Sequence, residues 1–111
     1  MRRVILESPF GDVDANLTYA RRCIRDCLER GEAPIASHLL FTQPGILRDE
    51  IPEERQLGID AGLAWIAVAD AMVLYIDRGV SPGMQNAMRI AQRSGLPVEL
   101  RCLEVVEVAT A

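Results

Sequence analysis

The chain is short and acidic: it has 111 residues, of which 50% are hydrophobic, and a formal net charge of −4 at pH 7. This length supports one domain over residues 1–111 with a well-filled core, and it leaves no room for a separate lid or a second substrate domain. The acidic balance argues against a duplex nucleic-acid surface, which needs clustered positive charge, although backbone amides can still bind a small anion.

The start of the chain and its cysteines indicate a cytoplasmic protein. The apolar run Val4–Leu6 stops at Glu7, so we expect no secretory leader, and no stretch approaches the length of a membrane span. Cys23, Cys27 and Cys102 form an odd set without the spacing of a disulfide framework. They are therefore expected to be reduced thiols.

No metal and no cofactor are expected. Cys23 and Cys27 share a helical face, but the chain has no second cysteine pair and a single histidine, His38. Core packing is therefore the expected role of these two thiols, rather than a metal site. Aromatic residues make up 5% of the chain, which argues against a cofactor pocket built from stacked rings.

The chain begins with a predicted strand and helix. Residues 2–10 form an apolar run that stops at Ser-Pro, as a buried parallel strand does at its carboxyl end. The segment 12–32 then places its apolar residues on one stripe at helical spacing. Asp12 or Asp14 is the expected N-cap of this helix, and Gly31 is its expected C-terminal stop.

A second strand and helix follow. Residues 33–41 are predicted to be a buried strand, and residues 42–52, with two prolines and a glycine, to be a loop. A helix is predicted over 52–70. Its Gly58 and Gly62 lie four residues apart, and because glycine costs helix stability, they mark close approach by a neighbour or a ligand.

The last third of the chain repeats the alternation. Residues 71–77 are the most strand-like run, and residues 81–95 form a predicted helix with Ser81 as N-cap and Gly95 as terminator. A fourth strand is predicted over 97–108.

The strand–helix alternation predicts the fold class. The order βαβαβαβ indicates a three-layer α/β/α arrangement with a parallel four- or five-stranded sheet, Rossmann-like or flavodoxin-like. Ligands of such sheets bind outside the carboxyl ends of the strands. The sequence gathers its glycines, prolines, serines, aspartates and its histidine at three such places, in ESPFGD, SHLLFTQPG and DRGVSPG.

Polar residues near the sheet have structural explanations beside functional ones. Ser81 either caps its helix or turns its hydroxyl to a ligand phosphate, and Asp77 caps, holds a ribose hydroxyl or ends its strand. His38 fits a satisfied near-core residue as well as a functional one, and Asp70 is a turn residue by default. Glu7 is harder to explain structurally, because a carboxylate at the end of a central buried strand is costly unless it is paired or faces a cleft.

Three segments resemble motifs of the nucleoside 2-deoxyribosyltransferase superfamily. VILESPF resembles its strand-one motif, VADAMVLYID its strand with two spaced aspartates, and GVSPGMQNAMRIAQRSGLPV its last-helix segment. The chain looks close to a compact branch of unknown function found in phages and bacteria. This resemblance implies a nucleoside or nucleoside 5′-monophosphate in the cleft, and cleavage or transfer at its N-glycosidic bond. In such enzymes a glutamate of the last helix attacks the anomeric carbon.

The motifs carry over residue by residue with one gap. Ser8–Phe10 match the first motif, Asp70 matches the acid of the second, and Ser81 and Gly83 match the phosphate or sugar turn. Phe10 stands at or beside a place where a tyrosine is frequent, so a hydrogen bond from that hydroxyl is missing.

The nucleophile of the superfamily does not carry over. Counting four residues from Gly83 reaches Ala87, where the enzymes have glutamate. Glu7 is the best substitute, and Glu54 and Asp60 on the second helix are further candidates, although Glu54 and Arg55 either clamp a substrate or complement the helix dipole. The candidate residues are therefore Glu7, Asp70 and Glu54 for catalysis, and Ser8, Pro9, Phe10, Gly11, His38, Asp77, Ser81, Gly83 and Met84 for ligand binding.

Three classes of function remain open: an N-glycosidase or deoxyribosyltransferase, a non-catalytic binder that sequesters a nucleotide-derived ligand or signal, and a structural subunit with a vestigial pocket. The expected partner is a small nucleoside or nucleotide, with no duplex nucleic acid and no membrane.

A homodimer or higher homo-oligomer is also expected. Gly58, Ala61, Gly62, Ala64 and Trp65 give the second helix a small-residue surface suited to close packing against another copy. Trp65 is at the same time the expected core residue of that helix.

Overall fold

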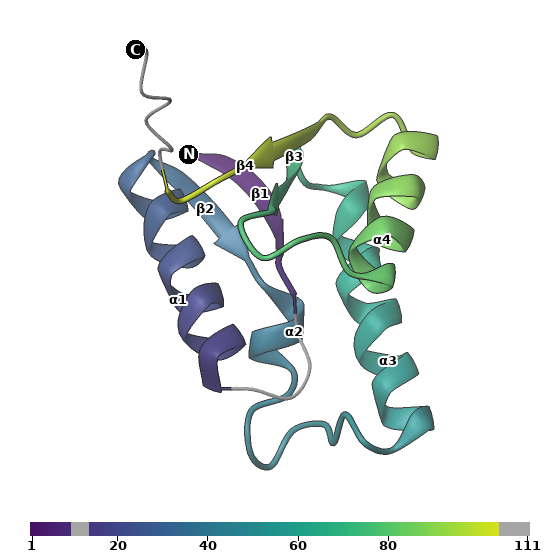
Figure 1. Cartoon of the computed structure of the whole chain (residues 1–111). Coiled ribbons are helices and arrows are strands. Elements are labelled where there is room, and N and C mark those ends of the chain that lie inside the picture. Colours follow the sequence, from purple (N-terminus) through teal and green to yellow (C-terminus); the bar gives the residue numbers. More distant parts are fainter. Residues whose placement is uncertain (10–13, 105–111) are drawn as a thin grey trace.

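The computed structural model describes residues 1–9 and 14–104, and within them it contains a four-stranded parallel sheet (Figure 1). The strands are β1 (Arg2–Glu7), β2 (Glu32–Ile35), β3 (Ala71–Tyr75) and β4 (Val98–Arg101), in the spatial order β2-β1-β3-β4. All three strand pairs are parallel. The predicted parallel α/β fold is therefore confirmed.

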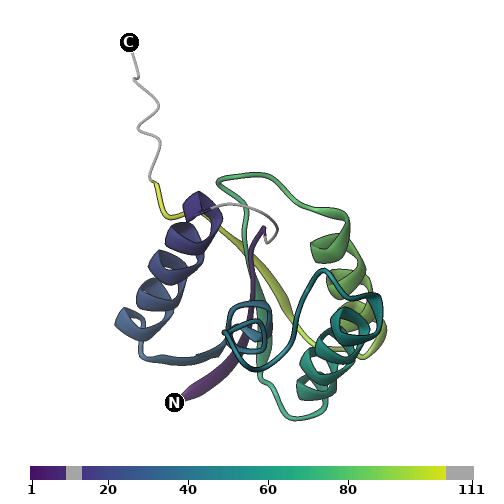
Figure 2. The same cartoon turned by 90° about the horizontal axis from the view of Figure 1, so that it is seen from below.

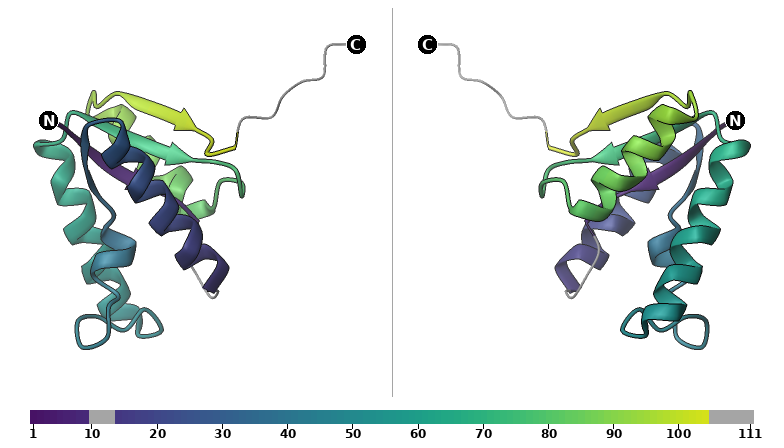
Figure 3. Two further views of the ribbon diagram at one scale, coloured as in Figure 1. Left: turned by 90° about the vertical axis from the view of Figure 1, so that its left-hand side faces the viewer. Right: turned by 90° about the vertical axis from the view of Figure 1, so that its right-hand side faces the viewer.

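Helices cover both faces of the sheet. They are α1 (Asp14–Glu29), α2 (Ser37–Leu40), α3 (Pro52–Leu63), α4 (Pro82–Arg93) and the 3-10 helix η1 (Ala64–Ala67). Seen along the sheet, α1 lies on one side and α3 and α4 lie on the other (Figure 2). Figure 3 shows the same layers from the two opposite faces.

The core is split by the pleat of the strands. Leu6 and Val73 pack toward α1, whereas Ile5, Met72 and Leu74 pack toward α4, because successive side chains of a strand point to opposite faces. Every residue of β3 is buried, which explains why this strand reads as an unbroken apolar run in the sequence.

The prediction of a second strand over residues 33–41 is wrong for its last part, residues 36–41. β2 ends at Ile35, and the chain turns at Ala36 into the single helical turn of α2, in which the Leu40 and Phe41 amides donate to the Ala36 and Ser37 carbonyls at 3.0 and 2.9 Å. A short apolar run does not distinguish a strand from a buried helical turn, which is why 33–41 reads as one strand.

Other boundaries are shorter than the sequence predicts. The helix predicted over 52–70 ends as α3 at Leu63 and tightens into η1. β1 stops at Glu7 and β4 stops at Arg101. Residues 105–108 of the last predicted strand, and the proposed cap Asp12, lie outside the described residues.

The prediction that Trp65 is a core residue is wrong. Its surface is 45% exposed, because the 3-10 geometry of η1 changes which side chains face the sheet, and the partly buried Ile66 packs against the core instead. The buried thiols of Cys23 and Cys27, in contrast, pack into the core beneath α1.

Within residues 1–9 and 14–104, no helix is long and apolar enough to cross a bilayer. In the same ranges, no three side chains of histidine, cysteine, aspartate or glutamate are grouped so that they could hold a metal ion.

A buried ion pair joins the two edge strands. Arg101, the last residue of β4, donates from Nη1 and Nη2 to the two carboxylate oxygens of Glu32, the first residue of β2, at 2.6 and 2.7 Å. The twist of the sheet brings these two ends together. The hydroxyl of Tyr75 accepts from Arg101 at 3.3 Å and donates to Asp26 of α1 at 2.6 Å. One hydrogen-bonded network therefore ties both sheet edges to α1.

Removing one partner of this pair should strongly destabilise the fold. Glu32→Ala leaves the Arg101 guanidinium buried without its bidentate partner, and we expect it to lower the free energy of unfolding by about 3–5 kcal/mol in urea denaturation. Replacing both residues together by leucine should cost much less than the sum of the single replacements, because no buried charge is left over.

The matched control is Glu29→Ala. Glu29 is exposed and pairs with Arg25 on the surface of α1 at 2.8 Å, so its loss should cost less than about 1 kcal/mol. Equal losses for Glu32→Ala and Glu29→Ala would contradict the role given to the buried pair.

Candidate active site

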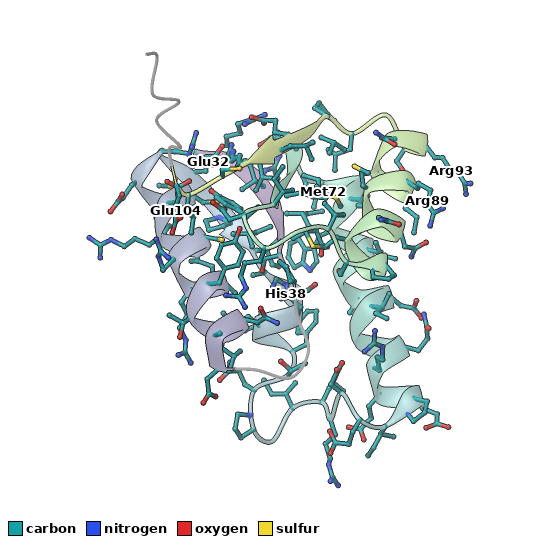
Figure 4. All side chains as sticks on the ribbon, in the orientation of Figure 1. Glu32, His38, Met72, Arg89, Arg93 and Glu104 are labelled. Atoms are coloured by element: carbon teal, nitrogen blue, oxygen red, sulfur yellow. The ribbon has the colours of Figure 1, made fainter. Side chains whose placement is uncertain are left out.

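A cavity of about 340 Å³ opens at the carboxyl edge of the sheet. Its wall is formed by the end of β1, by α2 and the loop after it, by α3, and by the first turns of α4. Ser8, His38 and Ser81–Gly83 all line it. The structure thus brings together the three segments that follow β1, β2 and β3. Figure 4 shows His38 in the interior of the molecule, between α1 and α4.

Glu7 supplies to the cavity wall a carboxyl group that has no partner among residues 1–9 and 14–104. Its side chain is largely buried, and no hydrogen bond or ion pair within the described part of the chain involves its carboxyl oxygens. Burial away from water raises the pKa of this carboxyl from 4.5 to about 7. Glu7 is therefore divided between its acid and its carboxylate form at neutral pH, as a group that exchanges protons with a ligand should be.

His38 and Ser8 form a hydrogen-bonded pair beside Glu7. The His38 Nε2 atom lies 2.9 Å from the Ser8 hydroxyl oxygen, and the His38 carbonyl accepts from the Thr42 hydroxyl at 2.6 Å. Burial lowers the pKa of the imidazole to about 4, so His38 is neutral at physiological pH. The pair can therefore orient a hydroxyl toward the cavity, but it brings no positive charge.

The glycines of α3 shape the cavity from within the chain. A Cβ atom on Gly62 would stand 2.9 Å from the Ser37 Cβ atom, so α2 and α3 touch only because position 62 has no side chain. A Cβ atom on Gly58 would lie 3.2 Å from Leu47 in the loop. The close approach that the sequence predicts at these glycines is thus a contact of α3 with α2 and the loop.

The first turn of α4 offers fewer free donors than its sequence suggests. Ser81 is its N-cap, as predicted, and the Ser81 hydroxyl accepts from the Met84 amide at 3.2 Å. The Gln85 amide donates to the Ser81 carbonyl at 3.0 Å, and Pro82 has no N–H group. Among these first positions, the Gly83 amide is the one left to face a ligand.

Charged groups surround the cavity where the loop meets α3. The Glu54 carboxylate accepts from the Arg48 amide at 3.1 Å, and Arg55 Nη1 pairs with Asp49 at 3.4 Å. Glu54, Asp49 and Arg55 all line the cavity. Glu54 thus combines a structural contact with a position at the site, and both interpretations of it remain open.

Other candidate residues lie elsewhere. Asp70 sits before the amino end of β3, where its carboxylate accepts from the Arg3 amide at 2.7 Å, so it lies at the opposite edge of the sheet. Asp77 accepts from the Tyr19 hydroxyl at 2.6 Å and from the Leu103 amide at 2.9 Å, and it holds the end of the chain after β4.

Not every residue of the first motif can be placed at the cavity. Pro9 is described but does not line it, and Phe10 and Gly11 lie outside the described residues.

Several residues of the cavity wall carry no signal in the sequence. Phe41 and Thr42 reach the site because the chain is helical rather than extended after Ala36, and Asn86 reaches it from α4. Ala87 also lines the cavity and is 4% exposed. A methyl group therefore stands where the resemblance leads one to expect a glutamate.

The structure is that of a flavodoxin-like α/β protein with a cavity at the carboxyl edge of its sheet. The chain belongs to the family described as a domain of unknown function (DUF7768), which matches residues 2–101. No curated protein matches the sequence.

The structure is similar to that of a 2-deoxyribosyltransferase from the psychrotolerant bacterium Bacillus psychrosaccharolyticus. The TM-score is 0.71 at 19% sequence identity, over 95% of this chain and 77% of that chain. The expected likeness to 2-deoxyribosyltransferases is therefore confirmed at the level of the fold.

The pKa of Glu7 gives a test of its burial. The folded chain keeps this proton up to about pH 7, whereas the unfolded chain loses it near pH 4.5, so the free energy of unfolding falls as pH rises between these values. We expect Glu7→Gln to be more stable than the parent above pH 7, by up to about 3 kcal/mol, with the advantage shrinking toward pH 4. Urea denaturation at a series of pH values measures this difference.

Glu53→Gln, an exposed change in the first turn of α3, serves as the control and should show no such pH-dependent gain. A constant difference between the Glu7→Gln variant and the parent at every pH would contradict the burial of an unpartnered carboxyl.

Proposed function

We propose that this protein binds a nucleoside in the carboxyl-edge cavity and cleaves or transfers at its N-glycosidic bond, with Glu7 as the reacting carboxylate. The observation that carries the proposal is the largely buried Glu7 carboxyl in the wall of the cavity, which has no partner in the described part of the chain. The similar solved structure is named as a 2-deoxyribosyltransferase, which supports a nucleoside as the ligand. A volume of about 340 Å³ is at the small end of the range for ligand sites, roughly 300–1,000 Å³, and suits a nucleoside better than a dinucleotide.

A single carboxylate can carry out the proposed reaction. In hydrolysis, the bond between C1′ and the base nitrogen breaks with its electron pair passing to the base, and a water oxygen bonds to C1′. The Glu7 carboxylate takes the proton of that water and passes it to the departing base. Because the transition state resembles an oxocarbenium ion, the negative charge of Glu7 also stabilises it. In transfer, a second base takes the place of water.

Ala87 favours a second candidate, a binder without catalysis. Its methyl group occupies the cavity wall at the place where a nucleophilic glutamate is expected from the resemblance. Such a protein would hold a nucleoside or a nucleotide-derived ligand in the same cavity and leave the glycosidic bond intact.

Base release separates the two candidates. The purified chain is incubated with a panel of ribo- and deoxyribonucleosides, and free base is followed by chromatography. We expect release that rises with pH through about 7, because the ionised form of Glu7 is the reactive one, and a loss of at least about a hundredfold in Glu7→Gln.

Glu53→Gln is the matched control for base release and should keep full activity. If no base is released but one nucleoside raises the melting temperature, the protein is a binder, because a ligand that binds the folded state stabilises it. If the panel gives neither response, the proposed function is wrong.

We also propose that two copies pair through the surface around η1. Trp65 and Val68 are partly exposed, and together with Ala33, Ile35 and Ala69 they line a hollow of about 130 Å³. A two-fold axis through this surface would bring Trp65 and Val68 of the two copies together, because a two-fold interface uses the same patch on both chains. This pairing would bury two exposed apolar side chains of each chain.

Sedimentation velocity at micromolar concentration tests the pairing. We expect a dimer for the parent and a monomer for Trp65→Arg, because burying the charge of an arginine between two copies is costly. Leu28→Arg changes an equally exposed leucine on α1, on the other face of the sheet, and should leave the dimer intact. A monomeric parent chain would contradict the proposed pairing of two copies.

A further inference from the structure

The described wall of the cavity is rich in negative charge. Glu7, Asp49 and Glu54 line it, against a single guanidinium, that of Arg55. The three acids come from three different segments, namely the end of β1, the loop after α2 and the first turn of α3. The excess is therefore a property of the whole wall and not of one acidic stretch.

The positive features of the site are already engaged or absent. Arg55 is paired with Asp49 at 3.4 Å, and the neutral imidazole of His38 adds no charge. In Figure 4, Arg89 and Arg93 of α4 project outward at the periphery, away from His38 and the interior. No cation of α4 therefore compensates for the acids of the wall.

The first turn of α4 does not balance the acids either. A phosphate usually takes several backbone amides at a helix start. Here the Met84 and Gln85 amides already donate to Ser81, and Pro82 has no N–H group, which leaves the Gly83 amide. One amide is a weak counterweight to the carboxyl groups of Glu7 and Glu54, which have no cation as a partner among the residues lining the cavity.

We infer that the cavity selects a nucleoside without a phosphate, and that it prefers one whose base carries a positive charge, such as a pyridinium or an N-alkylated purine. This inference rests on the proposed function, because it names the ligand class of that same cavity. A phosphate would bring further negative charge beside Asp49 and Glu54, whereas a cationic base would be attracted to the wall.

A cationic base also suits the reaction. When the bond from C1′ to a pyridinium nitrogen breaks, its electron pair neutralises the ring, so the base leaves as an uncharged molecule that needs no proton. Water supplies the oxygen that bonds to C1′, and the Glu7 carboxylate accepts the proton. Glu7 then acts as a base only, and no second group is needed to protonate the departing base.

Three closely matched ligands test the inference. They are nicotinamide riboside, which has a pyridinium base; its 5′-monophosphate, which adds a phosphate; and the reduced dihydronicotinamide riboside, which has an uncharged base of nearly the same size. Calorimetric titration into the full chain at low ionic strength gives the three dissociation constants. We expect the pyridinium riboside to bind at least about tenfold more tightly than its monophosphate, and several-fold more tightly than the reduced riboside.

Variants of the wall link the preference to its cause. Glu54→Gln keeps an oxygen that can accept from the Arg48 amide but loses the charge, so the preference for the cationic base should fall several-fold. Asp49→Asn frees Arg55 from its ion pair, so binding of the monophosphate should improve. Glu50→Gln is the control: it removes one charge from the same loop, but Glu50 is exposed and does not line the cavity.

The outcomes separate the inference from the proposed function. If the monophosphate binds as tightly as the riboside or better, or if the charged and reduced ribosides bind equally, the inference is overturned while a nucleoside site stands. If none of the three ligands and none of the nucleoside panel binds, the proposed function fails as well. Equal effects of Glu54→Gln and Glu50→Gln would also overturn the inference, because the preference would then not come from the cavity wall.

Discussion

The position of β1 between β2 and β3 is the constraint on which the rest of the site depends. Both edges of β1 are paired in parallel register, so β1 is an interior strand of the sheet. Its carboxyl end therefore places Glu7 and Ser8 at the middle of the carboxyl edge of the sheet. The segments after β2 and β3 must leave at the same edge on either side. The cavity is therefore a consequence of strand order, and the raised pKa of Glu7 is a consequence of its central place.

A second constraint acts between the helices that enclose this edge. α2 is a single turn, and it packs closely against α3 at Gly62, where a side chain would clash with Ser37. This contact turns His38 toward Ser8, and the hydrogen bond between them fixes the imidazole. The two edge strands of the sheet are joined by another interaction, the buried ion pair between Arg101 and Glu32.

Much of this arrangement could be predicted from periodicity and turn residues. The parallel sheet, the cap at Ser81 and the convergence of three segments at one edge follow from local patterns that agree with one another. The helical turn of residues 37–40 could not be predicted, because a short apolar run fits a strand and a helical turn alike, and its close contact with Gly62 joins residues far apart in the sequence. The contact between Glu32 and Arg101 depends on the twist of the whole sheet, and no local pattern marks it.

Individual candidate residues show the same difference between what local sequence patterns predict and what depends on the three-dimensional structure. Glu7 is a candidate from the sequence because a carboxylate at the end of a central buried strand is costly unless it is paired or faces a cleft. In the structure, Glu7 lines the cavity. Asp70 is selected through the resemblance, yet it follows a helix and precedes a strand, so topology carries it to the opposite edge. Trp65 is misjudged because helical periodicity is assumed to continue where the chain narrows to a 3-10 helix.

The alanine at position 87 has a steric consequence as well as a chemical one. It packs beneath the cavity with almost no exposed surface, one turn of α4 beyond Gly83. A glutamate there would add four heavy atoms beyond Cβ, in the space that is now open. The missing nucleophile and the depth of the cavity thus both result from the same short side chain. The additional cavity volume is available to a larger ligand.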